Sequence, residues 1–440
     1  MTKEGSPNDT TTSAYNYSPV EQSWLFSIIA VGQFFGTVAL TYGLSKFDIR
    51  KCFATLGLIS GIATLLTPLS AYIGFVPLLF MRFLQGVATS LSFAGIGSIT
   101  QQWSTVKESG MFFSLLSCHF QIGSVFTMPV AGLLCESRWG WPSLYYLQGV
   151  MTTVSFVLFY LFYRDDPYWH GLVSDKELSR IERGKISITT RESKATAHPK
   201  VPYKAMFTDI VVWGIQIGVT GVQFGFCLFV QYGPVYMNKV LKFDIKSTGV
   251  GTALPYIASI IMKTIAGPIS DHATCVSMKT NIKIFTTISN SLLALGTLSL
   301  AFITMDYPIL AQIAFIISVA FSGLNAVGSL KAVQMISQHY AHVMMNVVTM
   351  ISSFIILILP MLITVLAPDN THSQWRVIFI GVSIITFTGM IVFILTAEVE
   401  PRPWVKKESV KMNKVFQVDI NKTDIIPPEE KKDMEEKIEP

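Results

Sequence analysis

Residues 164–206 read RDDPYWHGLVSDKELSRIERGKISITTRESKATAHPKVPYKAM and form the one extended polar stretch inside the 440-residue chain. This stretch holds nine Lys or Arg against six Asp or Glu. On both sides the chain is almost continuously apolar, in blocks long enough to cross a bilayer, which takes about 20 apolar residues. Five such blocks precede the stretch and six follow it. The sequence therefore predicts two helical bundles joined by a long basic loop.

The composition places the chain in a lipid bilayer. Hydrophobic residues make up 50% of the chain, charged residues only 14%, and the mean hydropathy is +0.48. A soluble globular domain carries about 25% charged residues, so this chain has too little charge to cover a water-facing surface. Its five cysteines show no CxxC or Cys/His spacing, which indicates neither a disulfide framework nor a metal site. We predict an all-α polytopic membrane protein without a cofactor or a nucleic-acid partner.

The charges in the loops predict how the chain crosses the membrane. The expected spans are 23–44, 52–74, 76–100, 110–135, 143–163, 208–232, 247–269, 282–303, 308–328, 342–366 and 376–396. Most of the loop Lys and Arg then lie on one side, which the positive-inside rule makes cytoplasmic. The segments on that side are 45–51, 101–109, 164–206, 270–281, 329–341 and 397–440. Because eleven spans is an odd number, we expect the N-terminus outside or in a lumen and the C-terminus inside.

The chain divides into five expected regions. They are a lumenal or extracellular tail (1–22), a first bundle (23–163), a cytoplasmic loop (164–206), a second bundle (207–396) and a disordered tail (397–440). The first tail lacks the order of a signal peptide, so the first span is retained. It contains two N-glycosylation acceptors, Asn8 and Asn16. In the loop, Ser174 and Glu177 predict a capping box that starts a short surface helix, with Gly184 as its stop.

Several segments resemble the motifs of the major facilitator superfamily. Arg82-Phe83-Leu84-Gln85-Gly86 opens the third span as the superfamily's fourth-helix motif does, and Gly123 with Pro129 and Gly132 resembles its fifth-helix motif. Gly267-Pro268-Ile269-Ser270-Asp271 resembles the cytoplasmic loop motif of the second half. The first-half equivalent keeps its basic end, Arg50 and Lys51, but has Ser45 near the place of the usual Asp. The resemblance implies gating and structural roles for these motif residues.

More narrowly, the chain resembles the anion:cation symporter family, which includes sodium/phosphate cotransporters, sialin and vesicular glutamate transporters. The segments that carry the resemblance are Trp139-Gly140-Trp141, Asp166-Pro167, Val201–Thr208, Ala253-Leu254-Pro255-Tyr256, Trp375–Phe379 and Glu400–Trp404. The resemblance implies transport of a small organic anion or inorganic phosphate, driven by sodium ions or protons. It also implies twelve helices in two bundles of six, so the count of five plus six indicates that the first family helix is missing.

Three positions depart from the family pattern at ionisable sites. By ungapped alignment, Phe26 stands where the vesicular glutamate members have a histidine, Thr89 where they have an acidic residue, and Val222 where they have an arginine. The groups expected to hold an anion and couple it to a cation are therefore absent at these positions. Three explanations stay open: the substrate differs, the start of the sequence is short, or the protein no longer transports.

Ionisable side chains inside the spans are candidates for function, because they are costly in hydrocarbon. Arg82 is either structural or part of gating and proton coupling. His119 is either a proton relay or a neutral histidine that is hydrogen-bonded to a neighbouring helix. Lys263 either extends its ammonium toward the cytoplasm or contacts the substrate.

Uncharged polar residues complete the candidate substrate cavity. Gln223, Gln231, Tyr232 and Tyr256 lie on the first two helices after the loop, which line the central cavity in the family fold. The other cavity candidates are Thr89, His119, Gln121 and Asn325. For each of them, packing between helices is the competing interpretation.

We find no catalytic constellation and no P-loop, so neither an enzyme nor ATP-driven transport is indicated. The leading hypothesis is a monomeric secondary transporter for a small anionic solute, which works by alternating access in the plasma membrane or an intracellular vesicle membrane. The alternative is a degenerate or truncated member of the same family that does not transport.

Overall fold

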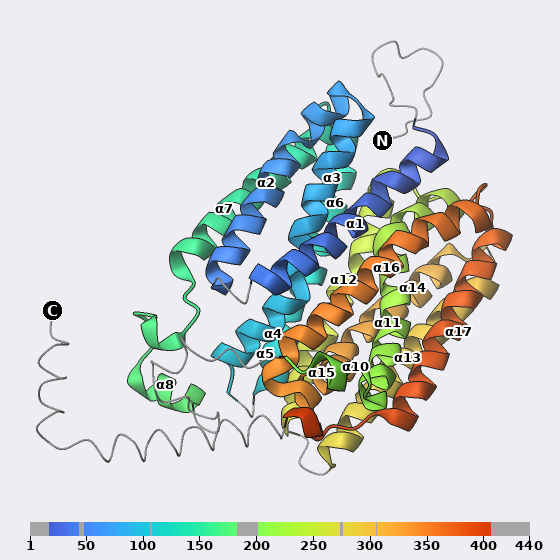
Figure 1. The fold of residues 1–440 in the computed structure, drawn as a ribbon. Helices are drawn as coiled ribbons and strands as arrows, with labels where there is room; N and C mark the ends of the chain where they lie inside the picture. The colour runs from blue at the N-terminus through green and yellow to red at the C-terminus, as the bar shows by residue number, and fades with distance from the viewer. Residues whose placement is uncertain are drawn as a thin grey trace, which may run out of the picture.

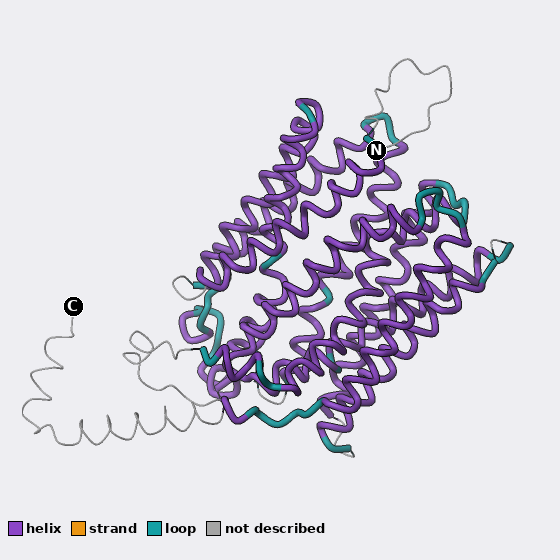
Figure 2. Tube along the Cα trace, turned by 45° about the vertical axis from the view of Figure 1, so that its right-hand side comes forward, coloured by secondary structure: helices purple, strands orange, loops and turns teal. Residues whose placement is uncertain are grey.

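The computed structural model describes residues 17–43, 48–105, 108–182, 201–272, 276–304 and 306–405. Within these ranges the chain is helical and contains no strand (Figure 2). Eleven helical segments are long and apolar enough to cross a membrane. This confirms the predicted all-α architecture and the predicted number of spans. The acceptors Asn8 and Asn16 lie outside the described residues.

Five spans form the first bundle (Figure 1). Their helices are α1 (Pro19–Gly43), α2 (Ile49–Ile73), α3 (Phe75–Thr89) with α4 (Leu91–Trp103), α5 (Ser109–Ser117) with α6 (His119–Glu136), and α7 (Gly140–Phe162). The third and fourth spans are each built from two helices. The breaks fall at Ser90 and Cys118, whose backbone N–H groups donate to carbonyls three residues earlier.

Six spans form the second bundle. Their helices are α11 (Ile210–Val235) with the π-helical turn η2 (Tyr236–Val240), α12 (Ile245–His272), α13 (Met278–Phe302), α14 (Pro308–Ser322) with η3 (Gly323–Ala326) and α15 (Ser329–Ser337), α16 (Ala341–Leu366) after η4 (Gln338–Tyr340), and α17 (His372–Thr396). The short elements between the bundles are η1 (Pro167–Trp169), α8 (Asp175–Glu182) and α10 (Tyr203–Phe207). We call the end of the bundles where α8, α10 and α15 lie the loop end (Figure 1).

The outward faces of the helices are apolar, as a lipid environment requires. On α7, Val150, Val154, Val157 and Leu161 recur at helical spacing and are all exposed. A soluble protein rarely leaves so large a contiguous apolar surface uncovered. The buried apolar core is concentrated in the second bundle, where α11, α13, α14, α16 and α17 pack together.

The structure changes two of the sequence-based assignments and bears out a third. Residues 329–341 were expected to be a loop, but α15 occupies 329–337 and extends the ninth span beyond the break at η3. Residues 397–405, assigned to the C-terminal tail, pack on the loop end of the second bundle. In the central loop, Ser174 Oγ accepts the N–H of Glu177 at the start of α8, which confirms the predicted N-cap. Gly184 lies outside the described residues.

Candidate functional site

The two bundles meet along two lines of contact: α5 and α6 pack against α12, and α1 and α4 pack against α16. The first of these lines carries the charged side chains. Glycines bring these helices close together near both ends of the interface. At the loop end, a Cβ atom on Gly267 would lie 3.1 Å from Met111 Cα, and one on Gly110 would overlap the Asp271 carboxylate. At the opposite end, a Cβ atom on Gly249 would lie 2.8 Å from the Met128 carbonyl oxygen. The helices can therefore approach this closely only because side chains are absent there.

Asp271 joins the two bundles at the loop end. Its carboxylate accepts the backbone N–H of Met111 in the first turn of α5 at 2.7 Å. It also pairs with the ammonium of Lys331 on α15 at 2.6 Å, and both side chains are only 4% exposed. Lys331 donates in addition to Ser270 Oγ at 3.1 Å. A carboxylate at a helix N-terminus is favoured by the helix dipole, so Asp271 stabilises the contact between α12 and α5.

Lys263 lies on α12 about two helical turns before Asp271, so it is further from the loop end. The expectation that its ammonium extends toward the cytoplasm is wrong, because the side chain is only 5% exposed and turns into the contact with α5 and α6. Its Nζ donates to the carbonyl oxygen of Ser117 at 3.1 Å, to Ser117 Oγ at 3.0 Å and to Gln121 Oε1 at 3.0 Å. Ser114 Oγ donates in turn to the Lys263 carbonyl at 2.8 Å. The structure thus brings the candidate Gln121 into contact with a buried cation.

His119 does not join this group. It is exposed and lies on the opposite face of the helix from Ser117 and Gln121, about 200° away in the helical rotation. Its Nδ1 is 2.9 Å from the Leu116 carbonyl oxygen, and its ring lies beside that of Phe120. A role for His119 as a proton relay stays a prediction.

The fourth-helix motif residues act within the first bundle. The Arg82 guanidinium donates to the hydroxyl of Tyr145 on α7, and Gln85 Nε2 donates to Thr64 Oγ1 and Thr67 Oγ1 on α2, each at 3.1 Å. These bonds link α3 to α2 and α7.

Gly86, the last residue of the fourth-helix motif, sets how closely α1 and α3 approach. Gly86 is packed so tightly that an added Cβ would overlap the Ile29 carbonyl on α1. Thr89 is exposed and bonds back to the Gly86 carbonyl at 2.7 Å. In the fifth-helix motif, Pro129 lies inside α6, and a Cβ on Gly132 would lie 3.4 Å from the Ile245 carbonyl of the second bundle.

Arg50 and Lys51 at the start of α2 also have partners in their own bundle. Arg50 Nε donates to the Tyr160 carbonyl at 2.7 Å, and its backbone N–H donates to Asp165 at 3.0 Å. Burial raises the pKa of the Asp165 carboxyl more than the Arg50 N–H lowers it. Lys51 forms an exposed ion pair with Asp48 at 3.0 Å. In the described part of the chain, neither basic side chain forms a hydrogen bond or an ion pair with the second bundle.

The cavity candidates of the second bundle differ in the contacts that their side chains make. Gln223 Nε2 donates to Ser352 Oγ of α16 at 2.8 Å. Tyr232 faces the first bundle, with its ring centroid 5.7 Å from that of Phe26 on α1. Gln231 Oε1 and the Tyr256 hydroxyl are buried without a hydrogen-bond partner among the described residues. Asn325 accepts a hydrogen bond from Ser329 across the break between η3 and α15.

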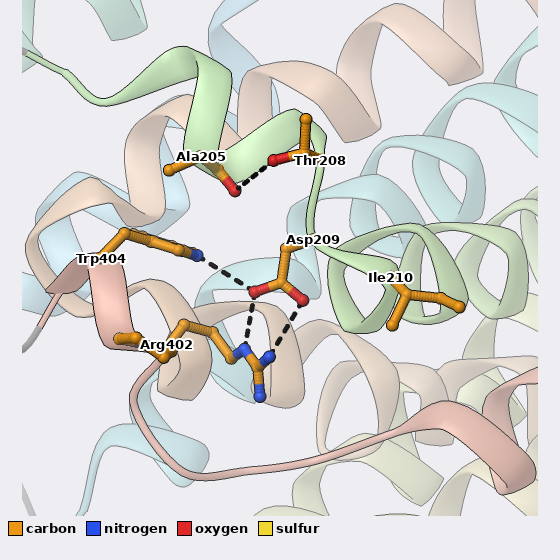
Figure 3. A pocket seen from close by; sticks show the side chains of 7 residues that line it. Ala205, Thr208, Asp209, Ile210, Arg402 and Trp404 are labelled. Atoms are coloured by element: carbon orange, nitrogen blue, oxygen red, sulfur yellow. Dashed lines mark hydrogen bonds and ion pairs between the residues drawn. The ribbon is translucent and has the colours of Figure 1, made fainter.

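A second charged cluster lies at the loop end, where the segment after α17 crosses the start of α11 (Figure 3). Asp209, the N-cap of α11, accepts from Arg402 Nε at 2.7 Å, from Arg402 Nη2 at 3.1 Å and from Trp404 Nε1 at 3.2 Å. These residues line a shallow pocket of about 430 Å³. Burial raises the pKa of the Asp209 carboxyl, but the hydrogen bonds from Arg402, from the Val211 N–H and from Trp404 outweigh it, so the pKa is below the ordinary value.

Arg402→Met is expected to lower the melting temperature of the purified protein, because charge-assisted hydrogen bonds of this kind contribute roughly 1–3 kcal/mol. A carboxyl with a lowered pKa stabilises the folded state above its unfolded pKa of about 3.9 and loses that contribution as the pH falls through the folded value. The gap between variant and wild type should therefore stay constant from pH 7 to about pH 5 and narrow below about pH 4. Arg180→Met, which breaks the exposed Arg180–Glu108 pair, should change little at any pH. Equal losses in both variants would contradict the assignment.

No group of three His, Cys, Asp or Glu that could hold a metal ion lies together in the described ranges.

Comparison with known proteins gives matches that agree with one another. The model of the Major Facilitator Superfamily matches residues 6–360. Sodium-dependent phosphate transport protein 3 of Mus musculus is 26% identical over 91% of this chain and 83% of its own length. Sialin of Homo sapiens is 24% identical over 89% of this chain and 78% of its own. Vesicular glutamate transporter 2.2 of Danio rerio is 23% identical over 88% and 67%, respectively.

Proposed function

The chain belongs to the major facilitator superfamily, a family of transporters, and on that premise we propose that it moves a small organic anion or inorganic phosphate by cation-coupled symport. It is an integral, multi-pass membrane protein with eleven candidate spans in the described ranges. Alternating access, in which two bundles rock about a site near the midplane, is the mechanism that a protein of two bundles supports.

The observation that carries the proposal is that the bundles are joined by separate sets of polar contacts at their two ends. At the loop end, Met111 N–H donates to Asp271 and Ser114 Oγ donates to the carbonyl of Lys263. Near the opposite end, Ser23 Oγ and Thr364 Oγ1 are 2.6 Å apart, and Ser27 Oγ donates to the Leu357 carbonyl at 3.2 Å. Because the two sets share no residue, one can break while the other stays closed.

The names of the relatives support an anionic solute. One relative is named as a sodium-dependent phosphate transport protein and another as a vesicular glutamate transporter. Phosphate and glutamate both carry net negative charge at neutral pH. Sodium ions or protons are the coupling cations that we propose, and the positive-inside rule places the loop end in the cytoplasm.

Uptake into proteoliposomes tests the proposal. Purified protein in liposomes should accumulate labelled phosphate or glutamate above protein-free liposomes when an inward sodium or proton gradient is imposed. An ionophore that collapses the gradient should abolish the accumulation. Background uptake of both anions, with folded protein confirmed by gel filtration, would favour a member of the family that does not transport.

A reversible cross-link tests the alternation directly. Because the hydroxyl oxygens of Ser23 and Thr364 are 2.6 Å apart, cysteines at both positions fall within reach of a disulfide bond. The oxidised Ser23→Cys/Thr364→Cys protein should lose transport, and reduction should restore it. The Ser23→Cys single variant is the matched control. Full uptake by the cross-linked protein would contradict alternating access at this interface.

A further inference from the structure

Lys263 is a buried cation whose hydrogen-bond partners among the described residues are all neutral. Its side chain is 5% exposed, and its three hydrogen bonds go to a backbone carbonyl, a hydroxyl and an amide oxygen. No carboxylate of the described residues forms an ion pair with it, whereas Lys331 on the neighbouring α15 is paired with Asp271. A buried ammonium without a counter-charge is costly, so its retention indicates a task other than packing.

The break between α5 and α6 explains why Ser117 can receive this cation. The N–H groups of Gln121 and Ile122 both donate to the Cys118 carbonyl. In a continuous helix, the N–H of Gln121 would donate to the carbonyl of Ser117. That carbonyl is left free at the C-terminal end of α5, where the helix dipole favours a positive charge. The break therefore supplies a neutral acceptor site for the Lys263 ammonium.

Two further hydrogen-bond donors share the face of α12 that carries Lys263. Tyr256 and Ser259 precede it at helical spacing and are 1% and 0% exposed. Both hydroxyls lack a hydrogen-bond partner among the described residues. Gly323 of η3 packs closely against this face, because a Cβ there would lie only 2.5 Å from Ser259 Oγ and 3.2 Å from Lys263 Cγ. One face of α12 thus presents a positive charge and two hydroxyls that have no acceptor.

The three acceptors of Lys263 belong to the first bundle, and Lys263 belongs to the second. Separation of α5 and α6 from α12 removes all three acceptors at once. The ammonium then needs new acceptors, and the hydroxyls of Ser259 and Tyr256 already lack them. Oxygen atoms of an anion supply both the hydrogen-bond acceptors and the missing negative charge.

We propose that Lys263, with Ser259 and Tyr256, binds the carboxylate or phosphate group of the transported anion, and that Ser117 and Gln121 hold the ammonium while the loop end is closed. This inference rests on the proposed function, and it assigns the residue that recognises the charge of the solute. Ser117 and Gln121 compete with the anion for the same ammonium, so they keep the charge satisfied when no anion is bound.

Because Ser117 and the anion compete for the Lys263 ammonium, substitutions of Lys263 and of Ser117 should affect the KM differently. Lys263→Gln keeps an amide donor toward Ser117 but removes the charge, so the KM for phosphate or glutamate should rise at least about tenfold. Ser117→Ala removes one competing acceptor and should leave the KM unchanged or lower it. Lys263→Arg keeps the charge and should retain part of the affinity. If Lys263 only fastened the two bundles, Lys263→Gln and Ser117→Ala would shift the KM in the same direction.

Stabilisation by ligand gives a second readout that does not depend on transport. Phosphate or glutamate should raise the melting temperature of the wild-type protein in detergent and of Ser117→Ala, but not that of Lys263→Gln. Glucose, which has neither a carboxylate nor a phosphate group, is the control solute and should not raise the melting temperature of any of the three proteins. Wild-type uptake with an unchanged KM in Lys263→Gln would overturn the assignment of Lys263 and leave the proposed function intact. A wild-type protein that neither takes up nor is stabilised by either anion would overturn both.

Discussion

Lys331→Met is expected to destabilise the protein strongly. The substitution removes the ammonium from a pair in which both side chains are 4% exposed and leaves the Asp271 carboxylate buried with the Met111 N–H as its remaining partner. Loss of one partner of a buried ion pair costs about 3–5 kcal/mol, because the other charge stays uncompensated. The melting temperature of the purified protein in detergent and the yield of folded protein should both fall well below those of the wild type.

Two control variants separate the buried charge from lysine loss in general. Lys51→Met breaks an exposed pair whose side chains are 61% and 59% exposed, and such pairs contribute about 1 kcal/mol or less. The double variant Asp271→Asn/Lys331→Met removes both charges and keeps an amide oxygen for the Met111 N–H, so it should recover most of the stability. If Lys331→Met melts like Lys51→Met, the charge on Asp271 is compensated in another way and the description of this contact is wrong.

The sequence predicted the spans well because span length and hydropathy are local properties. All eleven expected segments overlap helices of the structure, and the cap at Ser174 was readable from four consecutive residues. The dense loop charge between the halves likewise predicts two bundles from the sequence alone. These features depend on the chain itself and on the solvent around it, so no partner had to be known.

The partners of the buried lysines could not be predicted in the same way. Lys331 looked like a loop residue because it follows an apolar block, as most cytoplasmic loop lysines do. Whether such a lysine is solvated or buried depends on Asp271, which lies sixty residues earlier and reaches it only in the folded bundle. Lys263 was misjudged for the same reason, since its acceptors Ser117 and Gln121 lie in the other half. A signal was present, because both lysines continue an apolar helical pattern.

The segment Glu400–Trp404 illustrates a different limit. Its resemblance to the family identified it as a motif, but no sequence pattern indicated that Arg402 and Trp404 would bind Asp209 at the start of α11. Which residue this segment contacts depends on how the helices are arranged at the loop end. Motif recognition located the residues, and only the structure supplied their partner.

Gly86→Ala is expected to be the most damaging of the glycine substitutions in the family motifs. An added Cβ at Gly86 would overlap the backbone carbonyl of Ile29, and backbone cannot move aside as a flexible side chain can. The same crossing carries a second glycine, Gly32, where a Cβ would overlap the Phe83 carbonyl. Relief therefore requires α1 and α3 to separate, and overpacking of this kind costs about 1–3 kcal/mol or more.

Gly123→Ala is the matched control, because it is also a motif glycine in a span but has no atom within 4 Å of an added Cβ. The gain in helix propensity from Gly to Ala is about 1 kcal/mol, so this variant should be as stable as the wild type or slightly more stable. The melting temperature and the yield of folded protein in detergent compare the two variants.

Since α1 also contacts α16 of the second bundle, displacement of α1 by Gly86→Ala should weaken the Ser23–Thr364 contact as well. The disulfide between cysteines at those two positions should then form more slowly in the Gly86→Ala background than in the Gly123→Ala background. Equal melting temperatures and equal rates of disulfide formation would show that α1 tolerates the shift and that Gly86 does not set the helix spacing.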